Sequence, residues 1–387
     1  MRNLKIIGRS LLRWSGEDPL PLTATAWDVA LDAVLCAFGP SESRAVIELK
    51  RLYNSRNGAE ERLESIASWD ATCPIPSLTH DSILNLYHFA DSSVSCLVLA
   101  GGDIILVRES PSQGQELVEI VGSVDAGIAA AAWSPDEELL AIITQADTLL
   151  LMSRDIENIA EIPQTPEDVN VSSHVSVGWG KKETQFKGKR ARALQDPTVP
   201  ETVDEGALSA FDDGSVTISW RGDGAYFAVS SVEQARRRMI RVYSREGQLD
   251  SVSEPVDGLE GALTWRPSGN LIASIRRSSE RMEVVFFERN GLRHGQFDLR
   301  LSQEDLQAHT KPLTLRWNAD SSVLAVSYPD RVQLWTMSNY HYDLKQELVF
   351  PEVAPTTVSC SWDPERPLIA ALSTSGKNWP LYRPALV

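Results

Sequence analysis

The stretch VGWGKKETQFKGKR (177–190) combines three glycines, two aromatic residues and five basic residues, a composition that could bind phosphate or nucleic acid. A phosphate-binding P-loop needs Gly, four residues and then Gly-Lys-Ser/Thr, so that backbone N–H groups surround the phosphates. Gly180 is followed by Lys181 and Lys182, and no glycine lies five residues before it. The P-loop is therefore excluded, and a nucleic-acid clamp or a purely structural segment remains.

The other residues that could do chemistry form no recognised site pattern. The histidines make neither His-Glu-x-x-His nor a close pair of metal ligands, and there is no Gly-x-Ser-x-Gly nucleophile turn. Asp212-Asp213-Gly214 and Gly222-Asp223-Gly224 lack the alternating oxygen ligands and the final Glu of a calcium loop, so both are interpreted as turns. The carboxylates are numerous but scattered, which leaves a paired acid/base site unsupported. We expect no catalysis, no cofactor and no bound metal.

A second basic cluster, Arg236-Arg237-Arg238, is predicted at the top of a hairpin between two strands. It is interpreted either as an exposed turn or as a contact with an acidic surface. The residues that could touch a partner or RNA are therefore Lys181, Lys182, Lys187, Lys189, Arg190, Arg192, Arg236, Arg237 and Arg238.

Composition limits the class of protein and the class of partner. The 387 residues include 37 Lys plus Arg against 53 Asp plus Glu, a net charge of −16, which argues against a general nucleic-acid or DNA binder. The four cysteines are widely spread, as in a reducing compartment. Arg9 and Arg13 interrupt the apolar start, and no apolar run is long enough to span a membrane. We expect a cytoplasmic protein without membrane contact, with the nucleus left open as a second compartment.

A repeat organises the chain. Segments that begin near Trp133, Trp220, Trp265 and Trp317 each place a Trp at the end of a short strand, followed by a turn and two further apolar strands. Weaker copies carry Trp27, Phe89, Trp179 and Trp362. Most of these anchors lie roughly 40–45 residues apart, which is typical of WD40 propeller blades. Two stacked β-sandwiches are the alternative.

The seven anchors from Trp27 to Trp317 predict a seven-bladed WD40-type β-propeller over residues 1–350, with a strand near Lys5–Leu12 completing the last blade. Residues 351–387, with Trp362, are then an extra blade, the start of a second propeller or a truncated tail. In this scheme residues 177–186 are a blade strand. Residues 187–206 are a mobile polar loop, or else a docking site for an acidic partner or RNA.

Several segments resemble the N-terminal propeller of the largest subunits of the Elongator complex, the IKAP family. They run in order along the chain and include VGWGKKETQF (177–186), ISWRGDGAYFAVS (218–230), SEPVDGLEGALTWRPSGNLIAS (253–274), VFFERNGLRHGQF (285–297), RWNADSSVLAVS (316–327) and VQLWTMSNYHYDLKQEL (332–348). Two departures stand out. Lys187-Gly188-Lys189 replaces the family's usual His-Gly-Ser, and family members are much longer, with the dimer contact in their C-terminal part.

The resemblance implies a non-catalytic scaffold. Its partners would be the radical-SAM and acetyltransferase-like catalytic subunit and a second propeller subunit. The complex supports carboxymethyl-type modification of the wobble uridine (U34) of tRNA, which this chain would meet only through the complex. A WD40 adaptor in another multiprotein assembly is the alternative function, and a propeller hydrolase with a metal in its channel is a third.

The basic stretch yields a first prediction. Replacing Lys182, Lys187, Lys189, Arg190 and Arg192 with Ala should change folding stability by no more than about 0.5 kcal/mol, because these are predicted surface positions. It should also leave tRNA binding by the assembled complex nearly unchanged, since the acidic residues that follow and the net charge of −16 oppose phosphate. Filter binding at physiological salt measures this, and loss of most of the tRNA affinity would contradict it.

Overall fold

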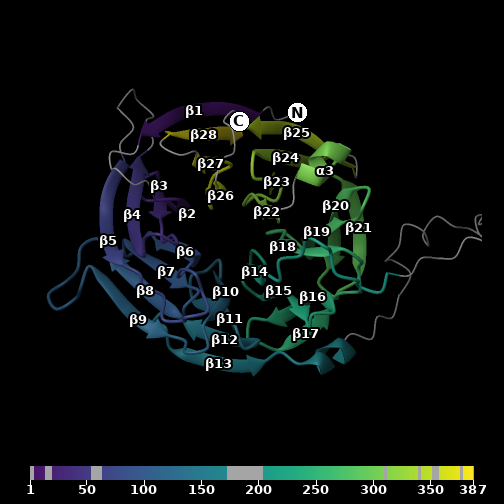
Figure 1. The fold of residues 1–387 in the computed structure, drawn as a ribbon, viewed down its shortest axis with the longest axis horizontal. Coiled ribbons are helices and arrows are strands. Elements are labelled where there is room, and N and C mark those ends of the chain that lie inside the picture. The colour runs from purple at the N-terminus through teal and green to yellow at the C-terminus, as the bar shows by residue number, and fades with distance from the viewer. Residues whose placement is uncertain are drawn as a thin grey trace, which may run out of the picture. The chain divides into compact units, whose positions relative to one another are not determined.

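The computed structural model describes residues 4–13, 20–53, 63–171, 204–308, 312–338, 341–350, 357–374 and 378–386. Within these ranges β-strands make up nearly all of the regular structure, beside the short helices η1 (Pro166–Val171) and α3 (Gln303–Ala308). The strands form seven antiparallel sheets of four strands each (Figure 1). The prediction of an all-β chain is confirmed. The chain divides into two compact units, unit 1 (Met1–Pro163 with Arg316–Val387) and unit 2 (Gln164–Leu315).

Four sheets of unit 1 are meanders of consecutive strands, although the first strand of the fourth begins just before the division at residue 316. The first holds β2 (Leu22–Asp28), β3 (Ala33–Phe38), β4 (Val46–Tyr53) and β5 (Leu63–Asp70). The second holds β6 (Ile83–Phe89), β7 (Val94–Leu99), β8 (Asp103–Arg108) and β9 (Val118–Ser123). The third holds β10 (Ile128–Trp133), β11 (Leu139–Thr144), β12 (Thr148–Ser153) and β13 (Asn158–Pro163). The fourth holds β22 (Thr314–Trp317), β23 (Val323–Ser327), β24 (Arg331–Ser338) and β25 (His341–Val349).

Unit 2 contains two further meanders of the same kind. One holds β14 (Thr217–Trp220), β15 (Tyr226–Glu233), β16 (Arg237–Ser244) and β17 (Leu249–Val252). The other holds β18 (Leu259–Trp265), β19 (Leu271–Arg277), β20 (Met282–Glu288) and β21 (Arg293–Asp298).

The seventh sheet, in unit 1, joins the two ends of the chain. It holds β26 (Thr357–Trp362), β27 (Ile369–Thr374), β28 (Asn378–Leu386) and β1 (Leu4–Arg13), in the order β1-β28-β27-β26. Figure 1 shows β1 alongside β28, and the two run antiparallel with Leu4 opposite Leu386 and Arg13 opposite Asn378. The N-terminal strand β1 does complete a sheet, as predicted. It belongs, however, to the sheet whose strand β26 ends with Trp362, and not to the sheet whose strand β22 ends with Trp317. Residues from both predicted domains, 1–350 and 351–387, therefore contribute strands to this sheet.

The predicted run of seven consecutive blades from Trp27 to Trp317 is wrong. Only six sheets of consecutive strands are described between Leu22 and Val349. Trp133 and Trp220 lie 87 positions apart, a distance that the repeat interprets as two blades with Trp179 as the anchor between them. The described part of that interval instead holds the rest of one sheet, η1 and the segment 204–216. Trp179 and the predicted blade strand 177–186 lie outside the described residues.

The aromatic anchors occupy equivalent positions in the sheets. Trp133, Trp220, Trp265 and Trp317 each end the first strand of a sheet, and their exposed fractions are 6%, 8%, 2% and 8%. The prediction that these four are equivalent and mostly buried is confirmed. In unit 1 two anchors also reach the first strand of the preceding sheet, because Trp27 Nε1 donates to the carbonyl of Ser361 (3.2 Å) and Trp362 Nε1 to that of Arg316 (3.1 Å).

The core lies between neighbouring sheets because each sheet alternates apolar side chains on its two faces. In β3, for example, Leu35 and Ala37 pack toward β7 and β8, whereas Val34 and Cys36 pack toward β27. In unit 2 Trp265 packs in one cluster with Ile240 and Val242 of the neighbouring sheet. A strand register that slipped by one residue would reverse both faces, so burial on two sides fixes the register.

Trp265 gives the second prediction. Trp265→Ala should lower the free energy of unfolding by roughly 3–5 kcal/mol, because the indole is buried and its Nε1 donates to the carbonyl of Gly269 (3.1 Å). Urea denaturation measures the loss. Trp69→Ala is the matched control, since Trp69 on the outer strand β5 is only half-buried and should cost less. A cost below about 1 kcal/mol at Trp265 would contradict this packing of the indole.

Candidate partner interface

The basic residues singled out from the sequence divide into two groups. Lys181, Lys182, Lys187, Lys189, Arg190 and Arg192 lie outside the described residues. Arg236, Arg237 and Arg238 lie at the turn between β15 and β16, as the hairpin prediction required. Arg236 is exposed there, and Arg237 is half-buried beside Gly206, where an added Cβ would meet its side chain at 3.4 Å.

Arg238 is an internal residue and cannot contact a partner. Its side chain is fully buried, and Nε and Nη2 each donate to a different oxygen of Asp212 at 2.6 Å. Nη1 donates to the carbonyl of Ser215 (2.8 Å) and to Ser230 Oγ (3.2 Å). Such a two-pronged arginine–carboxylate bond is strong and directional. The sequence prediction of Arg238 as a surface contact is wrong, because a carboxylate 26 residues away in sequence already holds it.

Two further arginines of unit 2 are buried in the same manner. Arg241 pairs with Asp168 (3.0 Å) and with Glu233, and Arg277 pairs with Glu260 (2.6 Å). Burying a charge is costly unless a partner compensates it, so each of these pairs can be broken only at a large loss of stability. Within residues 236–241, Arg238 and Arg241 thus serve buried ion pairs and are not part of a binding patch.

The segment 204–216, which precedes β14, supplies two carboxylates to arginines of unit 2. Asp204 pairs with Arg276 (3.1 Å) and Arg293 (2.9 Å), and Asp212 holds Arg238. The segment is also held by its backbone, since Asp257 Oδ1 accepts the N–H groups of Glu205, Gly206 and Ala207 at 2.9, 2.7 and 2.8 Å. The predicted mobile loop 187–206 is therefore wrong for its last residues, 204–206, which are fixed. Its other residues lie outside the described ranges.

The three N–H groups set the ionisation of Asp257. Burial alone would raise the pKa of this carboxyl, but the three backbone donors and Arg276 favour the charged form and lower it below its ordinary value. A lowered pKa in the folded state means that the charged carboxylate stabilises the fold at neutral pH. That stabilisation is lost as the pH falls below about 4, through the folded pKa.

Unit 1 contains a Ser–His–Asp arrangement that the sequence analysis missed. His88 on β6 places Nδ1 3.0 Å from Ser95 Oγ on β7 and Nε2 3.6 Å from Asp28 Oδ2 at the end of β2. Asp28 also lies 2.9 Å from Nη2 of Arg51, whose Nη1 donates to Glu109 (2.8 Å). These residues are up to 81 positions apart in the sequence, so no local sequence pattern predicts that they lie together.

This arrangement is built to hold sheets together. A serine nucleophile must expose its hydroxyl to a substrate, but Ser95 is only 1% exposed. Asp28, the carboxylate beside His88, is also already paired with Arg51. Burial lowers the pKa of His88 despite the nearby Asp28, so the ring is neutral at neutral pH. Burial would also lower the pKa of Arg51, but Glu109 and Asp28 outweigh it and raise that pKa. The cluster ties β2 and β4 to β6, β7 and β8.

Solved structures with the same architecture fix the fold. A WD40 domain of Toxoplasma gondii coronin superposes with a TM-score of 0.60 at 11% identity, covering 100% of this chain and 89% of that one. A chain of a mitotic checkpoint complex gives a TM-score of 0.57 at 13% identity, covering 99% and 93%. At such low identity the likeness shows the fold alone, a WD40-type β-propeller.

Sequence comparison decides the family. Residues 1–365 match the family described as "ELP1 first N-terminal beta-propeller". The chain belongs to this family. It is 46% identical over 302 residues to Elongator complex protein 1 of Schizosaccharomyces pombe, 40% identical over 400 residues to that of Saccharomyces cerevisiae, and 44% identical over 299 residues to that of Mus musculus. The predicted resemblance is confirmed.

The match covers most of this chain but little of each relative. The aligned parts are 77%, 93% and 74% of this chain, and 23%, 28% and 22% of the three relatives in the same order. The chain thus spans about a quarter of the length of these proteins. Among the described residues, no helix has the length and apolarity to cross a membrane, and no three metal-ligating side chains lie together in a way that could hold a metal ion.

Asp257 gives the third prediction. Asp257→Asn should destabilise the protein by about 1 kcal/mol at pH 7, because a neutral amide oxygen accepts three N–H bonds less strongly than a carboxylate. The difference from the unmodified protein should shrink as the pH falls from the ordinary aspartate pKa of about 4 through the lower pKa of Asp257 in the folded protein, because the carboxyl is then protonated. Equilibrium unfolding at several pH values measures both effects.

Asp213→Asn is the matched control, because Asp213 Oδ1 accepts the backbone N–H of Ser215 (2.9 Å), whereas Asp257 Oδ1 accepts three such groups. Its loss of stability should be clearly smaller. Equal losses in the two variants would show that the three-donor geometry at Asp257 has no special effect.

Proposed function

We propose that this chain is a non-catalytic scaffold of the Elongator complex, the first propeller of its largest subunit. The observation that carries the proposal is the family match over residues 1–365. It supports binding to other Elongator subunits, namely the radical-SAM and acetyltransferase-like subunit and a second propeller subunit. Through them the chain supports carboxymethyl-type modification of the wobble uridine (U34) of tRNA, in the cytoplasm and, as a second compartment, in the nucleus.

We also propose that the seven sheets act as seven blades of one propeller, with β1 closing the seventh. The likeness of the whole chain to WD40 domains supports this, as does the repeated place of the aromatic anchor at the end of each first strand. A propeller of this kind offers turns at both ends of every blade for contacts with partners. A scaffold without a reaction of its own acts through such contacts with its partners.

Among the basic residues singled out from the sequence, Arg236 remains a proposed partner contact because it is exposed at the tip of its hairpin. Arg237 is a weaker one because it is half-buried. Lys181, Lys182, Lys187, Lys189, Arg190 and Arg192 remain proposed contacts on sequence grounds alone.

Co-purification gives the fourth prediction. When the affinity-tagged chain is co-expressed with the other Elongator subunits of its own organism, we expect it to retain the catalytic subunit and the second propeller subunit in fixed ratio. The coronin WD40 domain is the matched control, since it shares the fold at 11% identity and should retain neither. Failure to retain any Elongator subunit, or modification of tRNA by the isolated chain supplied with cofactors, would contradict the scaffold role.

A further inference from the structure

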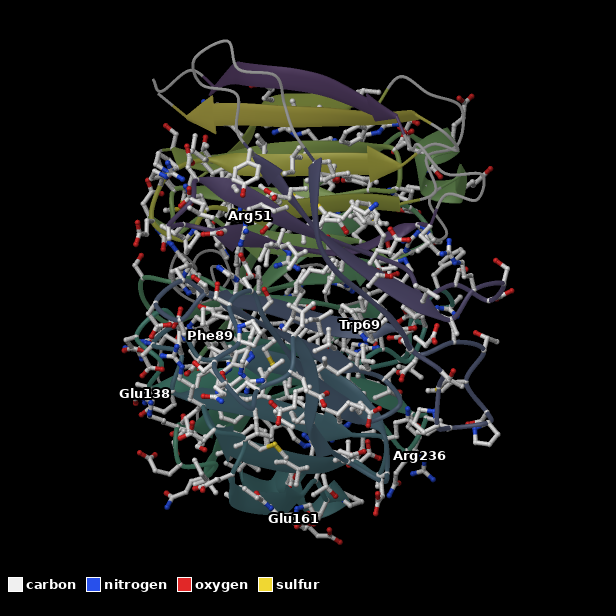
Figure 2. The ribbon with its side chains drawn as sticks, turned by 90° about the vertical axis from the view of Figure 1, so that its left-hand side faces the viewer. Arg51, Trp69, Phe89, Glu138, Glu161 and Arg236 are labelled. Carbon is white, nitrogen blue, oxygen red and sulfur yellow. The ribbon has the colours of Figure 1, made fainter. Side chains whose placement is uncertain are left out.

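Large apolar side chains are exposed at one end of three successive sheets of unit 1. In an antiparallel meander, the turn between the first and second strands and the turn between the third and fourth strands lie at the same end. Leu31 follows β2, Leu117 precedes β9 and Ile159 lies at the start of β13, so all three lie at this end. Their exposed fractions are 51%, 41% and 58%. Phe89 and Glu138, from the same end, lie at the left in Figure 2, and Trp69, from the other end, lies to the right.

Side-chain bonds join these turns into one surface. Arg366 of the β26–β27 turn pairs with Asp32 of the β2–β3 turn at 2.6 Å. Arg51 on β4 joins Asp28 to Glu109, which follows β8. Tyr87 at the end of β6 donates to Glu137 in the β10–β11 turn (3.1 Å). Neighbouring turns are therefore held in fixed positions from one sheet to the next.

The same turns are strongly acidic. We call residues 28–32, 90–93, 109–117, 134–138, 154–159 and 363–368 the acidic turn surface. Its carboxylates that reach solvent are Asp32, Asp91, Glu109, Glu116, Asp136, Glu137, Glu138, Asp155, Glu157 and Glu365, whereas Asp28 and Asp363 are buried. Its basic residues are Arg154 and Arg366. Arg154 already pairs with Asp91 (2.5 Å), and Arg366 already pairs with Asp32 and Asp363.

The opposite end of the same sheets differs in both respects. Its connections at 39–45, 71–82, 100–102, 124–127 and 145–147 carry four acidic residues, Glu42, Asp81, Asp125 and Asp147, beside the basic Arg44 and His80. None of the large exposed apolar side chains of the described residues lies in those connections. Exposed leucine and isoleucine with dense negative charge therefore characterise one end of these sheets and not the other.

We propose that the acidic turn surface docks a basic amphipathic segment of a partner protein, with lysines or arginines beside apolar side chains. Leu31, Leu117 and Ile159 would lose exposed apolar surface to the partner, and the carboxylates would complement its positive charges. The same charge disfavours RNA and anionic membrane surfaces. The assignment rests on the proposed function, since the partner would be a subunit of the same assembly.

The test measures binding of one probe to this chain alone. The probe is a synthetic peptide of leucine and lysine with helical periodicity, titrated by calorimetry at low and at physiological salt. Glu116→Lys/Glu157→Lys should weaken binding about tenfold or more, because it replaces attraction by repulsion at two exposed positions. Leu117→Ser/Ile159→Ser should weaken binding at both salt concentrations, because it removes apolar contacts with the peptide, which salt does not screen.

Glu42→Lys/Asp125→Lys is the matched control, with the same change in net charge at the opposite end of the sheets. It should bind the peptide within about twofold of the unmodified chain at physiological salt, where distant charges are screened. Equal weakening in the two charge variants would show unspecific attraction and overturn the proposal, as would an absence of binding by the unmodified chain. Since Elongator subunits are not used, either result leaves the co-purification prediction standing.

Discussion

The structure depends on one constraint, which is that a four-stranded sheet of this kind must bury both of its faces against neighbours. No single sheet of the described residues can form a core alone, so each one supplies apolar side chains in two directions. The buried aromatic at the end of the first strand serves this need, because an indole removes a large area from water in a single position. In unit 1 its N–H also bonds to the backbone of the preceding first strand, as Trp27 and Trp362 show, which sets the spacing of adjacent sheets.

The same constraint explains the buried charges. Buried ion pairs join strands within one sheet, as Asp28–Arg51 and Arg277–Glu260 do, and Arg51 also reaches Glu109, which follows β8 of the neighbouring sheet. Buried pairs of this type add little net stability compared with apolar packing, but they tolerate few alternative arrangements. In unit 2 the segment 204–216 is positioned in this way, by arginines on β16, β19 and β21 and by Asp257.

The repeated strands could be predicted from the sequence, but the contacts between residues far apart in the sequence could not. The Trp series and the period-two apolar runs indicated short strands in blades, and Trp133, Trp220, Trp265 and Trp317 lie where that pattern requires. The assignment of seven blades to the anchors from Trp27 to Trp317 was wrong because β1 pairs with β28 in the sheet of Trp362, and residue spacing cannot predict a pairing between the two ends of the chain. The prediction that Arg238 contacts a partner was wrong for a similar reason, because its own partner lies far away in the sequence. A run of arginines in sequence looks exposed until the carboxylate that faces it, in this chain Asp212, is known.

The distribution of charge separates structural residues from those available for recognition. The arginines that seemed to offer a basic patch in unit 2 are held inside it by carboxylates, so the local charges there largely cancel. In unit 1 an excess of acidic residues instead lies in exposed turns, where Arg51, Arg154 and Arg366 offset only part of the negative charge of the acidic turn surface. Exposed carboxylates placed close together repel one another and do not help folding. Their retention beside exposed Leu31, Leu117 and Ile159 is accounted for by recognition of a positively charged, partly apolar partner.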